Sequence, residues 1–269
     1  MIDWLRRAWR RHRSPVTAAD PSPSLGKPTS PSPWVTRDWR YLTLHFAQAT
    51  AQSRMSRWHP DQLLIGYTRT MLAGLLWCPA PHRIGMVGLG GGSQLRFCRR
   101  WLPEACIEAI EIDPRVIALR RKFRIPDDDA RLRVIEADAA VLLPERPAAY
   151  DLLLIDGYDA EGVPPALSSV RFHAACRDAL TADGVLASNL FGAGVDAHIE
   201  RMRRVFGSRL RVVPEPGMSN RVVFAWRGEM PPPERLQPAF WPAHITPGWR
   251  DPLTDAFERV ARALRTRRP

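Results

Sequence analysis

The chain has 269 residues, of which 45% are hydrophobic, and it carries a formal net charge of +11. This length supports one large α/β domain with appendages, whose core needs no disulfide bonds. The sequence lacks an apolar run of the roughly 18 residues that span a bilayer and an apolar signal-peptide core, and its four cysteines lack zinc or redox spacing. We therefore expect a cytoplasmic protein with free thiols and no bound metal.

The positive charge is concentrated at the two ends of the chain. Arginines crowd residues 1–13, where apolar residues at helical spacing predict a short basic helix, and they recur in 259–268. No nucleic-acid-binding motif accompanies them, so we expect no specific nucleic-acid partner. A solvated tail and contact with an anionic membrane stay open as roles for these ends. The Pro- and Ser-rich residues 14–33 predict a disordered linker.

The segment before the main domain predicts a small antiparallel sheet and a helix. Residues 34–58, and 40–46 above all, mix β-forming and polar residues as a partly exposed sheet does. Apolar residues then recur at nearly helical spacing from 62 to 77.

The main domain alternates strands with helices, which predicts a doubly wound, mostly parallel sheet. Strands are expected at 83–88, 106–111, 131–136, 151–155 and 185–190, and helices at 94–101, 114–123, 170–180 and 195–206.

The last two strands distinguish between two kinds of Rossmann sheet. Residues 209–213 and 221–226 are joined by a short, turn-rich link, which forces an antiparallel pair. A parallel sheet closed in this way resembles the seven-stranded AdoMet-dependent transferase fold rather than the dinucleotide-binding fold. A terminal amphipathic helix is expected at 251–265. Four segments follow from these patterns: a basic end with linker at 1–33, a lead-in at 34–80, the Rossmann-like catalytic domain at 81–228, and a linker with the terminal helix at 229–269.

A glycine run follows the first predicted strand of the main domain. In Gly88-Leu-Gly-Gly-Gly92 the backbone can approach a ligand closely, and the next helix presents free N–H groups. Ser93 occupies the place where the dinucleotide pattern requires glycine, which weakens an NAD-binding interpretation. Gly88, Gly90, Gly91 and Gly92 are therefore candidates for nucleoside binding, with a plain strand-to-helix turn as the alternative.

Acidic residues follow the second and third strands. Glu111 lies about 20 residues beyond the glycines, the distance at which an acid binds ribose hydroxyls in Rossmann folds. Asp138 follows the third strand, where a carboxylate can accept from an adenine amino group. Asp113 precedes a proline and is suited to cap a helix, and a surface acid remains the alternative for Glu111.

The fourth strand leads into a second acidic segment, Ile155-Asp-Gly-Tyr-Asp-Ala-Glu161. A partly desolvated carboxylate beside a like charge can accept a proton from an amine, while its neighbour holds a cation. Asp156 and Asp159 are the catalytic candidates, and an ordinary Asx turn is the alternative.

Residues from about 37 to 227 resemble the spermidine synthase family of polyamine aminopropyltransferases. The features that match are the helix with Tyr67, the glycine run, Glu111-Ile-Asp, Asp138, Asp156-x-x-Asp159 and Asp183-Gly-Val-Leu.

The resemblance implies decarboxylated AdoMet as the donor, a diamine such as putrescine as the acceptor, and a homodimer. It implies that Glu111 holds the ribose, that Asp138 holds the adenine, and that Tyr67 helps to bind the donor. It also implies that Asp156 assists deprotonation of the attacking amine and that Asp159 helps to bind the acceptor.

Two positions depart from the family pattern. Ser93-Gln94 stands where the family has an acid that binds the donor ammonium, and Thr68-Arg69 stands where it has Gln-Glu. A lost carboxylate and a nearby Arg69 would suit a donor that keeps its carboxylate, which is AdoMet itself. A methyltransferase is therefore the main alternative, and a non-catalytic nucleoside-binding protein is the second.

Overall fold

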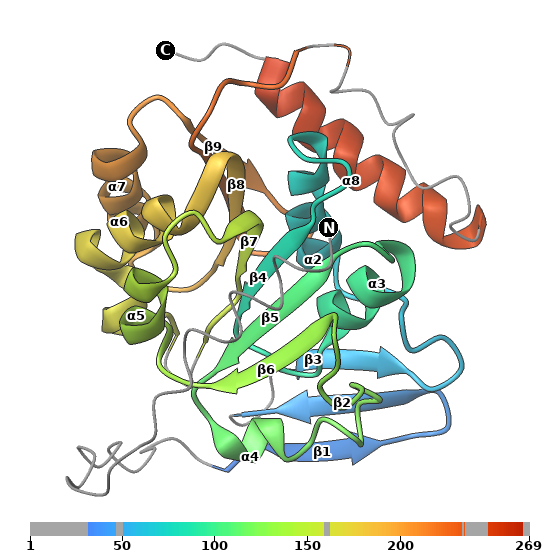
Figure 1. Cartoon of the computed structure of the whole chain (residues 1–269). Helices are drawn as coiled ribbons and strands as arrows, with labels where there is room; N and C mark the ends of the chain where they lie inside the picture. Colours follow the sequence, from blue (N-terminus) through green and yellow to red (C-terminus); the bar gives the residue numbers. More distant parts are fainter. Residues whose placement is uncertain (1–31, 47–50, 159–161, 233, 235–246, 266–269) are drawn as a thin grey trace, which may run out of the picture.

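The computed structural model describes residues 32–46, 51–158, 162–232, 234 and 247–265. A small antiparallel sheet precedes the main sheet, as predicted (Figure 1). Its three strands are β1 (Trp34–Arg37), β2 (Tyr41–His45) and β3 (Ala51–Ser56).

The main sheet has seven strands in the order β6-β5-β4-β7-β8-β10-β9. Its first five strands pair in parallel, whereas β10 is antiparallel to both β8 and β9. This arrangement confirms the predicted transferase-type sheet. The strands are β4 (Arg83–Val87), β5 (Cys106–Glu111), β6 (Leu132–Glu136), β7 (Tyr150–Ile155), β8 (Leu180–Leu190), β9 (Leu210–Pro214) and β10 (Arg221–Trp226).

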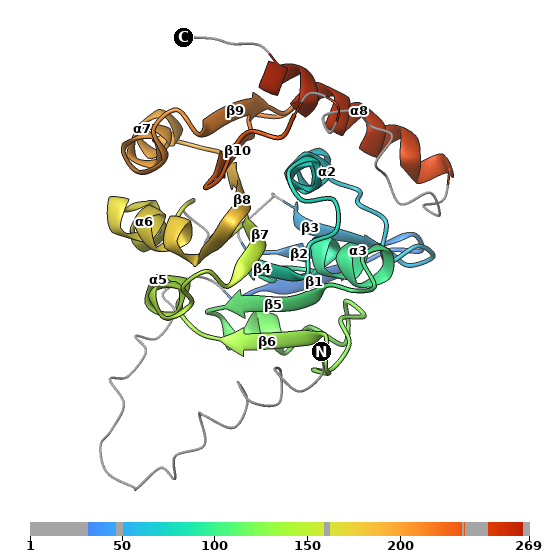
Figure 2. The same cartoon turned by 45° about the horizontal axis from the view of Figure 1, so that its top comes forward.

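Helices cover both faces of the main sheet (Figure 2). One face carries α2 (Gly66–Met71), the 3-10 helix η1 (Leu72–Leu76), α3 (Ser93–Trp101) and α8 (Pro247–Arg265). The other face carries α5 (Ala139–Leu142), α6 (Val170–Ala179) and α7 (Val195–Phe206). Shorter helices are α4 (Pro114–Ile117), η2 (Leu143–Glu145) and η3 (Pro165–Ser168).

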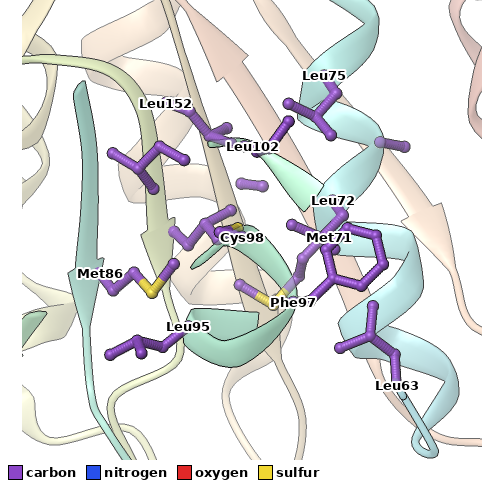
Figure 3. Packing of buried hydrophobic residues seen from close by; sticks show 14 of the residues in the cluster. Leu63, Met71, Leu72, Leu75, Met86, Leu95, Phe97, Cys98, Leu102 and Leu152 are labelled. Carbon is purple, nitrogen blue, oxygen red and sulfur yellow. The ribbon is translucent and has the colours of Figure 1, made fainter. Parts of the chain in front are cut away.

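The core on the α2 side fixes the helix that leads into the domain. Met71 and Leu72 are fully buried, and they lie near Leu95 and Phe97 of α3 (Figure 3). Burying side chains of this size stabilises the fold by about 1.5–3 kcal/mol each. The predicted apolar face of the terminal helix joins the same core through Leu253, Phe257, Val260 and Leu264.

Two predicted helices are shorter than expected. The helix expected from 62 begins only at Gly66 and continues as a 3-10 turn from Leu72. Gly74 lies so close to the Leu152 side chain that an added Cβ would be 2.6 Å from it, and glycine is a poor helix former. The helix expected at 114–123 ends at Ile117, and tight turns follow because Phe123 is drawn into the core.

One strand is longer than predicted. β8 begins at Leu180 rather than at 185, and its register against β7 shifts between Tyr150 and Leu152. Asp183 and Gly184, which precede the predicted strand, therefore form an irregularity within the observed one. Most of residues 1–33, with the predicted basic helix, lies outside the described residues, and so does much of 229–246. The division into four segments stays a prediction. None of the described helices is both long and apolar enough to span a bilayer.

Candidate active site

A cavity of about 600 Å³ lies at the carboxyl ends of the parallel strands. Its walls include residues that follow β4, β5, β6 and β7, together with residues from α2 and from the small sheet. Such crevices are where open α/β sheets bind ligands. All four predicted glycines line it, and so do Glu111, Asp138, Asp156 and Tyr67.

The glycine run turns sharply between β4 and α3. Gly88 has a φ of 89°, a left-handed conformation that favours glycine. A Cβ at this position would lie only 2.4 Å from the backbone oxygen of Asp156. The turn can therefore bring its backbone against both the β7 end and the cavity only because Gly88 lacks a side chain.

Glu111 is the last residue of β5 and is buried, with 9% of its surface exposed. The Leu89 N–H donates to Oε2 at 2.8 Å, and the Asp113 N–H donates to Oε1 at 2.9 Å. Burial raises the pKa of Glu111, and the backbone N–H groups of Asp113 and Leu89 partly oppose that rise. A carboxylate has about four acceptor positions, so each oxygen can still accept from a ligand hydroxyl.

Asp138 and Asp113 both begin short helices at the edge of the cavity. Asp138 caps α5 and accepts from the Ala140 N–H at 2.8 Å through Oδ1. Asp113 caps α4, as predicted, and pairs with Arg115 at 2.7 Å. The Asp113 carboxylate therefore already has two partners, the N–H group of the helix that it caps and the Arg115 guanidinium.

Asp156 follows β7, and both of its carboxylate oxygens accept from side chains. The Asn189 amide donates to Oδ1 at 2.9 Å, and the Tyr67 hydroxyl donates to Oδ2 at 3.2 Å. Burial raises the pKa of Asp156, and the two donors from Asn189 and Tyr67 oppose this rise. The result is an oriented, partly desolvated carboxylate, the arrangement expected of a general base. Tyr67 therefore lies at this end of the cavity.

Asn189 itself is held by Asn220, and the sequence patterns revealed neither residue. Both are buried, and Asn220 Nδ2 donates to Asn189 Oδ1 at 2.9 Å. Asn189 lies near the carboxyl end of the fully buried half of β8, and a polar side chain there is the signal that could have identified it. Asn220 lies beside it only because β10 pairs antiparallel with β8.

The small sheet closes one side of the cavity. Ser53 of β3 lines it and lies 3.4 Å from the Ser93 hydroxyl, measured between the two Oγ atoms. Gln94 also lines it, and its amide nitrogen contacts the Thr68 carbonyl oxygen at 3.3 Å. The two residues that replace the family acid therefore both face the cavity.

Arg69 does not line the cavity, so the expectation that it lies near the donor is wrong. Its guanidinium donates to the Leu63 carbonyl oxygen at 2.8 Å. The charges that act on it are those of Glu215, Arg259 and Asp255, which belong to the β9–β10 connection and α8. The helical position of Arg69 directs it away from Tyr67, toward the terminal helix.

The cavity is acidic although the chain as a whole is basic. Five carboxylates line it, and none of its described lining residues is Lys, Arg or His. The acids are Glu111, Asp113, Glu136, Asp138 and Asp156. Asp159 lies outside the described residues. Within the described part of the chain, no group of three or more His, Cys, Asp or Glu residues is placed to hold a metal ion.

The strand order and the acid-lined cavity define a transferase of the AdoMet-type Rossmann class. Solved structures agree with this fold. A probable spermidine synthase from Corynebacterium glutamicum has a TM-score of 0.64 at 19% identity, over 74% of this chain and 77% of that chain. A spermidine synthase in complex with the transition-state analogue AdoDATO has a TM-score of 0.60 at 19% identity, over 86% of this chain and 87% of that chain.

Sequence comparisons identify the family within that class. The spermine/spermidine synthase domain matches residues 67–190. A polyamine aminopropyltransferase from Neisseria meningitidis is 33% identical over 201 residues, which are 73% of this chain and 76% of that protein. The chain belongs to the spermine/spermidine synthase family of polyamine aminopropyltransferases, and it is a transferase.

Proposed function

We propose that the enzyme transfers an aminopropyl group from decarboxylated AdoMet to a diamine such as putrescine. The observation that carries this proposal is the charge of the cavity, where five carboxylates stand without a basic side chain among the described lining residues. Both substrates are cations, through the sulfonium and ammonium groups of the donor and the amines of the acceptor. A cavity lined by acids stabilises such charges.

The nucleoside part of the donor lies against the glycine turn in this proposal. Glu111 accepts hydrogen bonds from the ribose hydroxyls, and Asp138 accepts from the adenine amino group. Both carboxylates are already oriented by backbone N–H groups, which leaves acceptor positions for the ligand. The Gly88 turn lets the nucleoside approach the sheet edge closely.

The reaction itself takes place beside Asp156. The neutral amine of the acceptor forms a bond to the donor carbon attached to sulfur, and the carbon–sulfur bond breaks. The sulfur keeps the electron pair and becomes the neutral thioether of methylthioadenosine. The nitrogen then loses a proton to the Asp156 carboxylate, which Asn189 and Tyr67 hold in place. Asp159 is proposed to bind the acceptor.

A direct assay tests this proposal. The purified chain is mixed with decarboxylated AdoMet and putrescine, and methylthioadenosine is measured by chromatography. We expect product that depends on both substrates. Absence of product with putrescine, cadaverine and spermidine would contradict the proposal.

The methyltransferase alternative has lost one of its two motivations, because Arg69 does not line the cavity, whereas Ser93 and Gln94, which replace the family acid, do. AdoMet carries a carboxylate that would meet a cavity of the same charge. Calorimetry with the two donors therefore separates the two functions, and we expect tighter binding of decarboxylated AdoMet. Tighter binding of AdoMet would reverse the assignment.

A further inference from the structure

Arg96 lies in the first turns of α3, directly after the glycine run, and only 5% of it is exposed. Its guanidinium donates to three backbone carbonyl groups. Nε donates to Pro60 O at 2.5 Å, and Nη1 donates to Phe123 O at 2.7 Å and also to Gly91 O. One buried cation therefore joins three backbone segments that are far apart in the sequence.

The three segments belong to different parts of the fold, and Arg96 joins two of them to the glycine turn that lines the cavity. Pro60 belongs to the connection between the small sheet and α2, and Gly91 belongs to the glycine turn that lines the cavity. Phe123 belongs to the turn between α4 and β6. Arg96 itself does not line the cavity. It can therefore act on a bound nucleoside only through the backbone that it holds.

The turn that contains Phe123 is packed tightly against the glycines. A Cβ on Gly91 would be 3.1 Å from Phe123 Cδ1, and a Cβ on Gly92 would be 2.4 Å from Ile125 Cδ1. Arg124, between these two residues, has a φ of 53°, which a residue with a side chain rarely adopts. The glycine turn thus depends on an adjoining turn that is itself in an unfavourable conformation, and Arg96 binds both.

Burying this cation is electrostatically unfavourable. Burial lowers the pKa of Arg96 to about 9, with Asp61 opposing the change and Arg124 adding to it. Nη2 has no hydrogen-bond partner among the described atoms. A planar guanidinium is nevertheless the one side chain that can present several donors at fixed angles to separate carbonyl groups.

We infer that Arg96 is a positioning residue, which holds the glycine turn in the shape that binds the donor nucleoside. This inference rests on the proposed function, since the nucleoside is the one named there. Without the guanidinium, Gly91 O and Phe123 O lose their donors, and the turn relaxes to conformations that bind the nucleoside less well. The chemistry at Asp156 stays unchanged once substrate is bound.

The experiment measures methylthioadenosine binding by calorimetry in the full chain. Arg96→Met is expected to raise the Kd about tenfold or more, because unsatisfied buried carbonyl groups are costly. Arg96→Lys keeps a charged donor but loses the planar arrangement of several N–H groups. Its Kd is expected to lie between that of Arg96→Met and that of the unmodified chain. In steady-state assays the KM for the donor rises, whereas kcat changes by less than about threefold.

Arg99→Met is the matched control on the same helix. Arg99 pairs with the half-exposed Asp129 at 2.6 Å and does not line the cavity. We expect the Kd of Arg99→Met for methylthioadenosine to stay within about twofold of that of the unmodified chain, since exposed ion pairs contribute little. Unfolding temperatures of all variants separate a loss of stability from a loss of binding.

The outcomes distinguish this inference from the proposed function. An unmodified chain that fails to bind methylthioadenosine contradicts the proposed function, and the inference falls with it. An unmodified chain that binds, with unchanged Kd in both Arg96 variants, overturns the inference alone, whatever the unfolding temperatures. If Arg96→Met does not fold, Arg96→Lys carries the test. Loss of folding in both variants would assign Arg96 to the fold as a whole and overturn its specific role.

Discussion

The two ends of the cavity hold their carboxylates in different ways. At the end where we propose that the nucleoside binds (the nucleoside end), Glu111 and Asp138 accept hydrogen bonds from backbone N–H groups. At the end where we propose that the reaction occurs (the reacting end), Asp156 accepts from two side chains, those of Tyr67 and Asn189, which lie 89 and 33 residues away in the chain. Backbone donors stay in place whatever the side chains are, whereas a donor on a side chain can be removed by one substitution.

This difference implies that binding and chemistry are separable. Substitutions at the nucleoside end should weaken donor binding, and substitutions at the reacting end should slow the reaction without loss of nucleoside affinity. A substitution that changes both quantities equally would break the comparison.

Asp156→Asn should have the largest effect. The amide cannot accept the proton, and general-base catalysis contributes about 10²–10⁴-fold, so kcat/KM should fall by roughly 10³-fold. Methylthioadenosine affinity, measured by calorimetry, should stay within about twofold if the two ends act separately. A rate that stays within about tenfold of the original would contradict the role of Asp156 as the base.

Glu111→Gln should produce the next largest effect, on donor binding. The uncharged amide keeps the shape of the side chain but loses charge-assisted hydrogen bonds, each worth about 1.5–3 kcal/mol, so the Kd for methylthioadenosine should rise about 10- to 100-fold. The rate at saturating donor should change far less. A large fall in kcat with an unchanged Kd would assign Glu111 to the reacting end instead.

Asn189→Leu should have an intermediate effect that depends on pH. The Asn189 amide lowers the pKa of Asp156, so its loss should raise that pKa. In a plot of kcat/KM against pH, the fall in rate on the acidic side (the acidic limb) should then move to higher pH. Tyr67 and Tyr158 are the other titratable groups that act on this carboxylate among the described residues, and burial keeps the pKa of both hydroxyls raised. Rates measured between pH 5 and 9 test the shift.

Asn220→Ala is the control for this prediction, because it removes only the support of Asn189. It should shift the same limb in the same direction by a smaller amount. An acidic limb that stays in place in Asn189→Leu, with cooperative unfolding retained, would show that the amide does not tune Asp156.

The smallest effect on rate is expected away from the cavity, at two buried histidines that face each other between α6 and α7. His173 and His198 have ring centroids 4.7 Å apart, and burial lowers their pKa values to about 3 and about 4. Below the unfolded value of about 6.5, the unfolded chain binds protons that the folded chain excludes. The free energy of unfolding should therefore be highest above that pH, and it should fall steadily as the pH is lowered toward about 4.

Urea denaturation measures this loss. Between pH 7.5 and 5.5 the free energy of unfolding should fall by about 2–3 kcal/mol for the pair, and His198→Asn should reduce the pH dependence. Its rate at pH 7.5 should match that of the unmodified chain, since neither histidine lines the cavity. The same variant separates acid unfolding from the titration of Asp156.

Local sequence patterns were sufficient to predict which residues line the nucleoside end of the cavity. Gly88 had to be glycine in a strand-to-helix turn, and Glu111 stood at the expected distance from it, so both could be predicted as cavity residues from spacing alone. Asp138 and Asp113 cap helices that begin right after them, which is also a local property. The strand alternation and the short link before the last strand likewise predicted a mostly parallel sheet closed by an antiparallel pair, because each depends on neighbouring residues.

The sequence by itself therefore determined the transferase fold, the glycine turn and the position of the acids at the strand ends. The tertiary structure alone decided what surrounds Asp156 and what supports the glycine turn. Asn220 reaches Asn189 through antiparallel pairing, Arg96 reaches Phe123 through packing, and Arg69 turns toward α8. Contacts between residues distant in the chain depend on how whole elements pack, and the periodicity of one segment carries no information about them.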